Sequence, residues 1–252
     1  MRAFLLASAG LTGYYLLALL VVPMSLRAWR GVPDELVRKT QHVGYGASIW
    51  LLLTLFDAWY LAIAASALLV VIAYPALLAL ERWPGYARAF PDRAPGRGEL
   101  RRSLLWVQAS FALNIVLFWG LGGPVGRIAL AAGVMAWTLG DAFAALIGRA
   151  IGRHAANGRF LAGDKTAEGT TAMALAAGTA VALTVGTYGG TDLGSALAAG
   201  VVAGPVAAAV ELYSPHGTDT LTVPAAAGSA VWLTVTIATR LEPVLARIVA
   251  GA

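Results

Sequence analysis

Both lysines of the chain lie in polar clusters that could contact the phosphates of a ligand. Lys39 lies in segment 38–42 and Lys165 in segment 163–170, whereas the other sixteen cations are all arginines. A lysine ammonium is a compact, flexible point charge and an arginine guanidinium is a rigid planar fork, so the two are not interchangeable. The use of lysine at these two positions predicts phosphate contacts, although a biased composition alone would also leave two lysines.

The first cluster places three potentially cationic side chains on one face of a helix. Arg38 and His42 are four residues apart, and Lys39 and His42 are three apart, which are spacings of neighbouring side chains on a helix. Such crowding is favourable only when an anion is near. The alternative is a basic patch that meets anionic lipid headgroups, but attraction to lipid does not call for a histidine.

Asp141 is the acid whose position most strongly indicates a function. The residues on either side of it, 136–139 and 142–147, are almost wholly apolar, and a carboxylate in such a membrane helix is costly and usually functional. Small residues share its helix face, namely Ala144, Ala145, Gly148 and Gly152. They permit close helix packing, and they equally leave room for a ligand. Packing explains the glycines but not the acid, so we favour a functional role.

The third cluster lies directly before another apolar stretch and combines a cation with the start of a helix. Backbone amides and the helix dipole favour anions at a helix N-terminus, and Lys165 adds a charge that suits phosphate oxygens. The segment is not a Walker A loop, because Asp164 precedes the lysine and the upstream glycine spacing is wrong. Asp164 and Glu168 could also be ordinary acids of a helix start.

A fourth group of polar residues surrounds a short connection late in the chain. Glu211 precedes this connection, and Asp219 lies within it. Together with Asp141 and Glu168, these acids predict a divalent-metal site, because Mg²⁺ is usually held by a few carboxylates and by substrate phosphates. Carboxylates for a metal and cations for phosphates together indicate phosphoryl or nucleotidyl transfer, in which catalysis is positioning and charge stabilisation.

Membrane helices must position these clusters. The chain has 252 residues, of which 59% are hydrophobic and 12% are charged, and its mean hydropathy is +0.73, whereas soluble domains carry about 25% charge. At about 20 residues per span, the apolar stretches predict an all-α membrane bundle of about eight transmembrane helices, which forms one domain over residues 1–252. The expected helices cover residues 4–22, 43–56, 59–80, 103–121, 128–147, 171–188, 193–212 and 223–239.

The cations are distributed unevenly among the connections between these helices. Fourteen of the eighteen follow the first, third and fifth expected helices, so in this topology they all face one side of the membrane. The positive-inside rule makes that side cytoplasmic and the N-terminus external. We therefore expect an integral membrane protein with a cytoplasmic site and no role in binding nucleic acid. The Ala- and Arg-rich usage suggests the cell membrane of a prokaryote.

In this order the clusters resemble the polyprenol kinase family, which includes dolichol kinase, phytol kinase and the CTP-dependent diacylglycerol kinases. The second and third clusters together make a specific match, and the first alone is weak. The chain has Asp219-Thr220 where the family typically has Asp-Asn, a departure that bears on nucleotide preference. The matching segments are Arg38-Lys39-x-x-His42, Gly140-Asp141-x-x-Ala144-x-x-x-Gly148-Arg149-x-x-Gly152, Lys165-Thr166-x-Glu168-Gly169-Thr170, and Glu211 followed by Asp219 and Leu221-Thr222-Val223-Pro224.

The resemblance implies an integral membrane kinase that transfers the γ-phosphate of CTP to the hydroxyl of a lipid alcohol, a prenol or diacylglycerol, with Mg²⁺ or another divalent metal. We expect Asp141 to be the general base, with His42 as second choice and Lys165 as the catalytic cation. The expected metal ligands are Asp141, Glu168, Glu211 and Asp219. The expected nucleotide contacts are Arg38, Lys39, Arg149, Arg153, Lys165, Thr166, Gly169 and Thr170.

Two other functions remain open at this point. The family looks distantly similar to phosphatidate cytidylyltransferase, which would make a CDP-lipid from the same nucleotide. A membrane transporter is the non-enzymatic alternative, and Pro75 and Pro205 could interrupt helices as transporters often do. Transporters, however, gather their polar groups near the middle of the bilayer, and the clusters of this chain lie at the ends of the expected helices.

Overall fold

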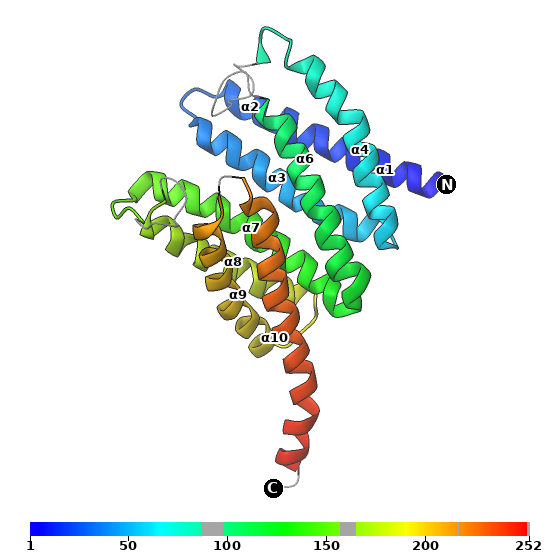
Figure 1. Ribbon diagram of the computed structural model, residues 1–252, viewed down its shortest axis with the longest axis vertical. Helices are drawn as coiled ribbons and strands as arrows, with labels where there is room; N and C mark the ends of the chain where they lie inside the picture. Colours follow the sequence, from blue (N-terminus) through cyan, green and yellow to red (C-terminus); the bar gives the residue numbers. More distant parts are fainter. Residues whose placement is uncertain (87–97, 157–164, 216, 251–252) are drawn as a thin grey trace. The chain divides into compact units, whose positions relative to one another are not determined.

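The computed structural model is all-α, as predicted, and describes residues 1–86, 98–156, 165–215 and 217–250 (Figure 1). Six helical runs in this part of the chain are long and apolar enough to cross a membrane, which supports an integral membrane protein. The chain divides into two compact units, Met1–Val116 and Leu117–Ala252. Each unit has its own interior.

The first unit is held together by apolar packing and by a buried chain of hydrogen bonds. The Tyr15 hydroxyl lies 2.7 Å from Ser48 Oγ and accepts a 2.8 Å hydrogen bond from Gln108 Nε2. Side-chain hydrogen bonds of this kind connect helices in an apolar environment, and this one joins three of them. The helices of the unit are α1 (Arg2–Leu16), which continues through a π-turn (Leu17–Val21) into α2 (Val22–Ala28), then α3 (Asp34–Leu55), α4 (Trp59–Leu80) and α6 (Glu99–Asn114).

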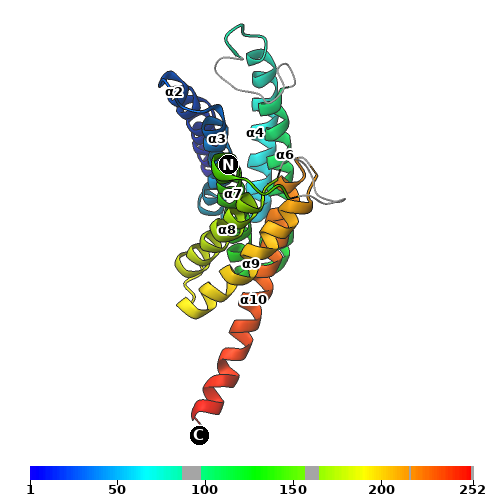
Figure 2. The ribbon, with the colours of Figure 1, turned by 90° about the vertical axis from the view of Figure 1, so that its left-hand side faces the viewer.

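The second unit is built from four long helices, α7 (Leu121–Ile151), α8 (Ala167–Thr187), α9 (Leu193–Tyr213) and α10 (Asp219–Ala250). Helix α7 packs against α8 and α10, and α9 packs against the same two (Figure 2). A π-helical stretch, Ile115–Gly120, precedes α7. Gly123, with φ of 61° and ψ of −147°, breaks the helical path near the start of α7.

Small residues let the helices of the second unit approach closely. A Cβ atom on Gly178 of α8 would lie 2.8 Å from the Gly200 oxygen of α9, and one on Gly133 of α7 would lie 2.5 Å from the Pro224 oxygen of α10. Real Cβ atoms do not come so near to a backbone oxygen. Glycine at these positions is therefore a packing requirement, in the manner of small-residue interfaces between membrane helices.

Candidate active site

Polar residues of the second unit gather at the end where α7 and α9 finish and α8 and α10 begin. We call this region the motif end and define it by Gly152, Thr166, Tyr213 and Asp219, the residues at those four helix boundaries. The connection between α9 and α10 is short. The Ser214 and Thr222 hydroxyls are 2.7 Å apart across the α9–α10 turn.

A two-bond ladder fixes the residues after α7 against those before α8. The amide of Ala156 donates to the Lys165 oxygen over 2.8 Å, and the amide of Ala167 donates to the His154 oxygen over 2.9 Å. The intervening segment 157–164 lies outside the described residues, and with it Asp164. The ladder holds Lys165 and His154 together at the start of α8.

Lys165 bridges α8 and α9 at the motif end. Its Nζ lies 2.8 Å from Glu211 Oε1 and also donates to the backbone oxygen of Glu211. The side chains are 21% and 12% exposed, so the pair is partly shielded from water. A cation near the last carbonyls of a helix is favourable, and the structure therefore brings two predicted site residues together in one contact.

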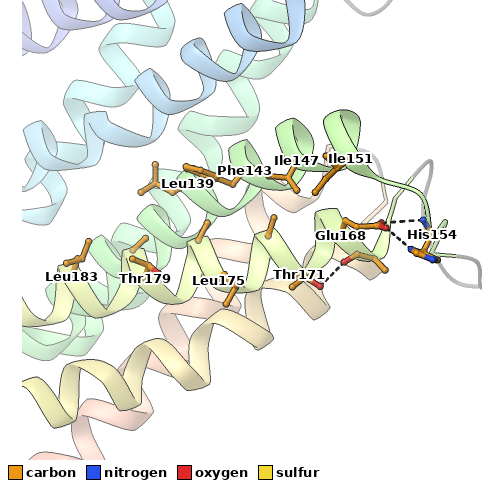
Figure 3. A pocket seen from close by; sticks show the side chains of 14 residues that line it. Leu139, Phe143, Ile147, Ile151, His154, Glu168, Thr171, Leu175, Thr179 and Leu183 are labelled. Carbon is orange, nitrogen blue, oxygen red and sulfur yellow. Dashed lines mark hydrogen bonds and ion pairs between the residues drawn. The ribbon is translucent and has the colours of Figure 1, made fainter.

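His154 and Glu168 form a second ion pair at the same end (Figure 3). His154 Nδ1 lies 2.7 Å from Glu168 Oε1, and the His154 amide reaches Glu168 Oε2 over 3.4 Å. The histidine side chain is 80% exposed and the glutamate 22% exposed. Sequence analysis gave His154 no specific role, because its partner is fourteen residues away and only the ladder brings the two together.

Thr166 and Gly169 have clear structural roles at the start of α8. Thr166 is the N-cap, and its Oγ1 accepts a 3.1 Å hydrogen bond from the Gly169 amide, a common device at helix starts. A Cβ on Gly169 would lie 2.9 Å from the Ala144 oxygen of α7, and one on Gly148 would lie 3.1 Å from Thr166 Oγ1. The small-residue stripe on α7 is therefore in part a packing surface for α8. Nucleotide contacts by Thr166, Gly169 and Thr170 stay predictions.

The remaining predicted residues of the second unit lie along the same helices. Asp141 is half-buried on α7, Asp219 is half-buried in the first turn of α10, and Arg149 and Arg153 are exposed around the end of α7. Among the residues that the structure describes, no three acids or histidines form a group that could hold a metal. His216 lies outside those residues. Magnesium ordinarily needs only one or two protein carboxylates beside substrate phosphates, so the four predicted ligands stay a prediction.

The first cluster lies on α3 in the first unit, where its arginine is paired with two acids. Arg38 is paired with Glu35 one helical turn away, and its Nη2 lies 3.4 Å from Glu99 Oε1 of α6. Lys39 is only 6% exposed, and His42 is half-buried on the same helix. A basic patch for lipid headgroups needs exposed cations, so Lys39 does not belong to one.

A groove runs along the second unit between α7 and α8 (Figure 3). Its volume is about 870 Å³. Apolar side chains line most of its length, and the His154–Glu168 pair lies at one end. The residues that line it are Leu139, Phe143, Ile147, Ile151, His154, Ala167, Glu168, Thr171, Ala172, Leu175, Ala176, Thr179, Ala180 and Leu183.

Comparison with known proteins decides the family. No protein-family model matches the chain, and no solved structure matches it. A phytol kinase of Synechocystis sp. is 32% identical over 234 residues, which cover 90% of this chain and 93% of the relative. The chain belongs to the polyprenol kinase family. The chain is therefore a membrane phosphotransferase with an alcohol acceptor. The family predicted from its motifs is confirmed.

Proposed function

We propose that this polyprenol kinase transfers the γ-phosphate of CTP to the hydroxyl of a phytol-like prenol at the cytoplasmic membrane face. The observation that carries the proposal is the end-to-end similarity to a phytol kinase, 32% identity across 90% of the chain. The polar residues of the motif end provide groups suited to phosphoryl transfer. They combine a partly shielded lysine with exposed arginines and several carboxylates, which are the groups that phosphoryl transfer uses for positioning and charge stabilisation.

Lys165 is the proposed contact to the nucleotide phosphates. In the ligand-free protein its charge is compensated by Glu211 at 2.8 Å. A triphosphate carries more negative charge than one carboxylate and would compete for the same ammonium. Arg149 and Arg153, exposed around the end of α7, would hold the outer phosphate oxygens. Arginine suits them because its planar fork can make two parallel hydrogen bonds.

The transfer itself needs a proton acceptor on the prenol hydroxyl. The hydroxyl oxygen forms a bond to the γ-phosphorus, the bond from that phosphorus to the β,γ-bridging oxygen breaks, and CDP leaves. The hydroxyl proton passes to a general base, for which the Asp141 carboxylate is our first choice and the His42 imidazole the second. Asp141 qualifies because it is half-buried on α7, the helix that leads into the motif end.

Acids of the second unit are the proposed ligands of a divalent metal. When bound, it would neutralise developing charge on the phosphates. Mg²⁺ commonly arrives with the nucleotide and takes one or two carboxylates from the protein. Asp141, Glu168, Glu211 and Asp219 are the proposed source of these. Glu211 becomes available as soon as Lys165 turns to a phosphate, because the lysine is its ion-pair partner.

The proposed topology has eight spans, an external N-terminus and a cytoplasmic motif end. Two features support the count. The break at Gly123 divides the helical run Glu99–Ile151 into two stretches, which raises six runs to seven, and α3, 22 residues long, is the eighth. Short connections join α3 to α4 and α8 to α9, as expected between antiparallel spans. Arg149, Arg153 and Lys165 all lie at the motif end, which the positive-inside rule assigns to the cytoplasm.

The test uses CTP labelled at either the α- or the γ-phosphorus, purified protein in detergent, and phytol as acceptor. We expect γ-label in a lipid product and α-label in CDP alone. Transfer of α-label to lipid would instead establish CDP-lipid synthesis and overturn the kinase mechanism. Diacylglycerol serves as the second acceptor, and phosphorylation of diacylglycerol without phosphorylation of phytol would overturn the proposed acceptor.

A further inference from the structure

The groove between α7 and α8 differs from ordinary lipid-facing surface in the sizes of its side chains. Large residues one turn apart on α7 form one wall, among them Phe143 and Ile147. Opposite them, α8 presents the small residues Ala172 and Ala176. Figure 3 shows the α7 side chains and Leu183 along the length of the groove. Its volume of about 870 Å³ is within the range of small-molecule sites, about 300–1,000 Å³.

The groove is long, narrow and polar at one end. The lining residues of α8 extend from Ala167 to Leu183, about 24 Å at the helical rise of 1.5 Å per residue. Among the residues that the structure describes, the ionisable side chains in its lining are His154 and Glu168, which lie together at one end. An occupant that matches this lining has one polar end and an apolar tail.

The polar end of the groove lies beside the proposed phosphate site. Glu168 follows Lys165 by three residues at the start of α8, and both side chains are anchored there by ion pairs, to His154 and to Glu211. A hydroxyl at this end would therefore be close to the nucleotide, whereas the apolar part of the groove extends along α8 into the membrane-spanning part of the helix.

We propose that this groove binds the isoprenoid chain of the lipid alcohol and holds its hydroxyl next to the His154–Glu168 pair. The inference rests on the proposed function, and it names where and how the acceptor lies. The Glu168 carboxylate would accept a hydrogen bond from the hydroxyl and orient it, a role that replaces its proposed role as a metal ligand. Because Asp141 does not line the groove, in this arrangement Glu168 takes the hydroxyl proton and Asp141 remains a metal ligand. Phe143, Ile147 and Leu175 would contact the branched chain, and Ala172 and Ala176 leave the space that the chain fills.

The experiment measures how the position of a bulky side chain in the groove limits the length of the prenol. Ala172→Phe blocks the groove near its polar end, and Ala176→Phe blocks it one turn further along, about 12 Å from Glu168 by helical rise. Ala198→Phe is the matched control, because Ala198 is an exposed alanine on α9 that does not line the groove. The acceptors are phytol and the shorter geraniol.

We expect a graded result. Ala176→Phe raises KM for phytol about tenfold or more, as for an overfilled apolar site, but leaves KM for geraniol near that of the wild type. Ala172→Phe raises KM for both acceptors, and Ala198→Phe changes neither. KM for CTP stays unchanged in all three, which shows that the variants are folded.

Two outcomes would overturn different claims. A wild-type enzyme that transfers no phosphate to either prenol overturns the proposed function. A wild-type enzyme that is active, with the same acceptor profile in Ala172→Phe, Ala176→Phe and Ala198→Phe, overturns the groove assignment alone and makes the groove a place for ordinary bilayer lipid.

Discussion

The two lysines of this chain lie in different surroundings, one of them buried and the other partly exposed. Lys39 lies on α3 of the first unit at 6% exposure, next to an arginine that is paired with two acids. Lys165 lies at a helix boundary of the second unit, 21% exposed, with one carboxylate and one carbonyl as partners. A buried cation beside an ion-paired arginine maintains a structure. A partly exposed one with a single exchangeable acid is able to change partners when a ligand arrives.

The difference teaches that residue type and local sequence are not enough to assign a phosphate contact. Both lysines occur in segments that match the family pattern, yet their surroundings separate them. Substitutions that separate nucleotide affinity from stability will test the contrast.

The largest effect is expected at Lys165. Replacing it with Met should lower kcat/KM for CTP by about 100-fold or more, the range seen when one electrostatic contact to a reacting group is removed. Lys165→Arg should recover little, because the guanidinium fork does not reproduce a point charge. The measurement is γ-label transfer to phytol at varied CTP. Activity within about twofold of wild type, too small a change for a lost contact of this kind, would remove Lys165 from the site.

Lys39→Met should produce the reverse pattern. We expect a lower melting temperature than that of Lys165→Met, because Lys39 is buried and loss of a buried polar contact is costly, and a smaller rise in KM for CTP. Thermal unfolding and nucleotide titration on the same preparations check both parts. An equal rise in KM for CTP in the two variants would contradict the difference proposed between the two lysines and place Lys39 in the nucleotide site.

The sequence predicted the middle of most helices but the ends of only some. The expected 59–80 coincides with α4 and the expected 193–212 matches α9 within one residue, whereas other ends were missed. The expected stretch 43–56 is observed as α3 from Asp34 to Leu55, and the expected 171–188 as α8 from Ala167 to Thr187. Hydropathy detects the part of a helix that lies in lipid, but α3 begins more than two turns earlier, where two acids occupy its first turn and favour a helix start. Arg38, Lys39 and His42 are therefore residues of this helix, as their spacing indicated, although they precede the apolar stretch that hydropathy detects.

The contacts of the candidate site were harder to predict than its members. Glu168 and Glu211 were expected to share a metal, and in the structure each has its own cation, His154 or Lys165. These pairings depend on the rotation of each helix about its axis and on the ladder that joins segments 154–156 and 165–167. Neither is encoded in spacing along one helix. Gly148 was recognised as part of a small-residue stripe and Gly169 was predicted as a nucleotide contact, but only the structure shows which surface each one packs against.

A moderate effect is expected at the second ion pair of the motif end. Glu168→Gln should lower kcat/KM for phytol by about tenfold, because an amide retains the shape but loses the charge-assisted hydrogen bond to the hydroxyl. The melting temperature should change little, since a pair with a histidine that is 80% exposed contributes little to stability in water. His154→Ala is the matched variant and should have the smaller effect. If His154→Ala were the more damaging change, the histidine rather than the carboxylate would orient the hydroxyl.

The smallest effect is expected at Asp192, at the opposite end of α9 from Glu211. Asp192 is the N-cap of that helix and accepts a 2.9 Å hydrogen bond from the Ser195 amide. Hydrogen bonds from the Ser195 side chain and then its backbone lower the pKa of Asp192 below its ordinary value of 3.8. A lowered pKa in the folded state means that ionised Asp192 stabilises the protein at neutral pH and that this stabilisation is lost as the pH falls through the lowered pKa.

Asp192→Asn therefore separates charge from capping geometry. Asparagine is an equally good N-cap, so the melting temperature should drop slightly at neutral pH and the difference from wild type should shrink as the medium is acidified below the ordinary aspartate pKa. Kinase activity should not change, because α9 places about 30 Å of helix between this residue and the motif end. A loss of activity as large as that of Glu168→Gln would mean that removing any acid from the second unit lowers activity. Charge-removing variants would then give no support for a special role of the motif end.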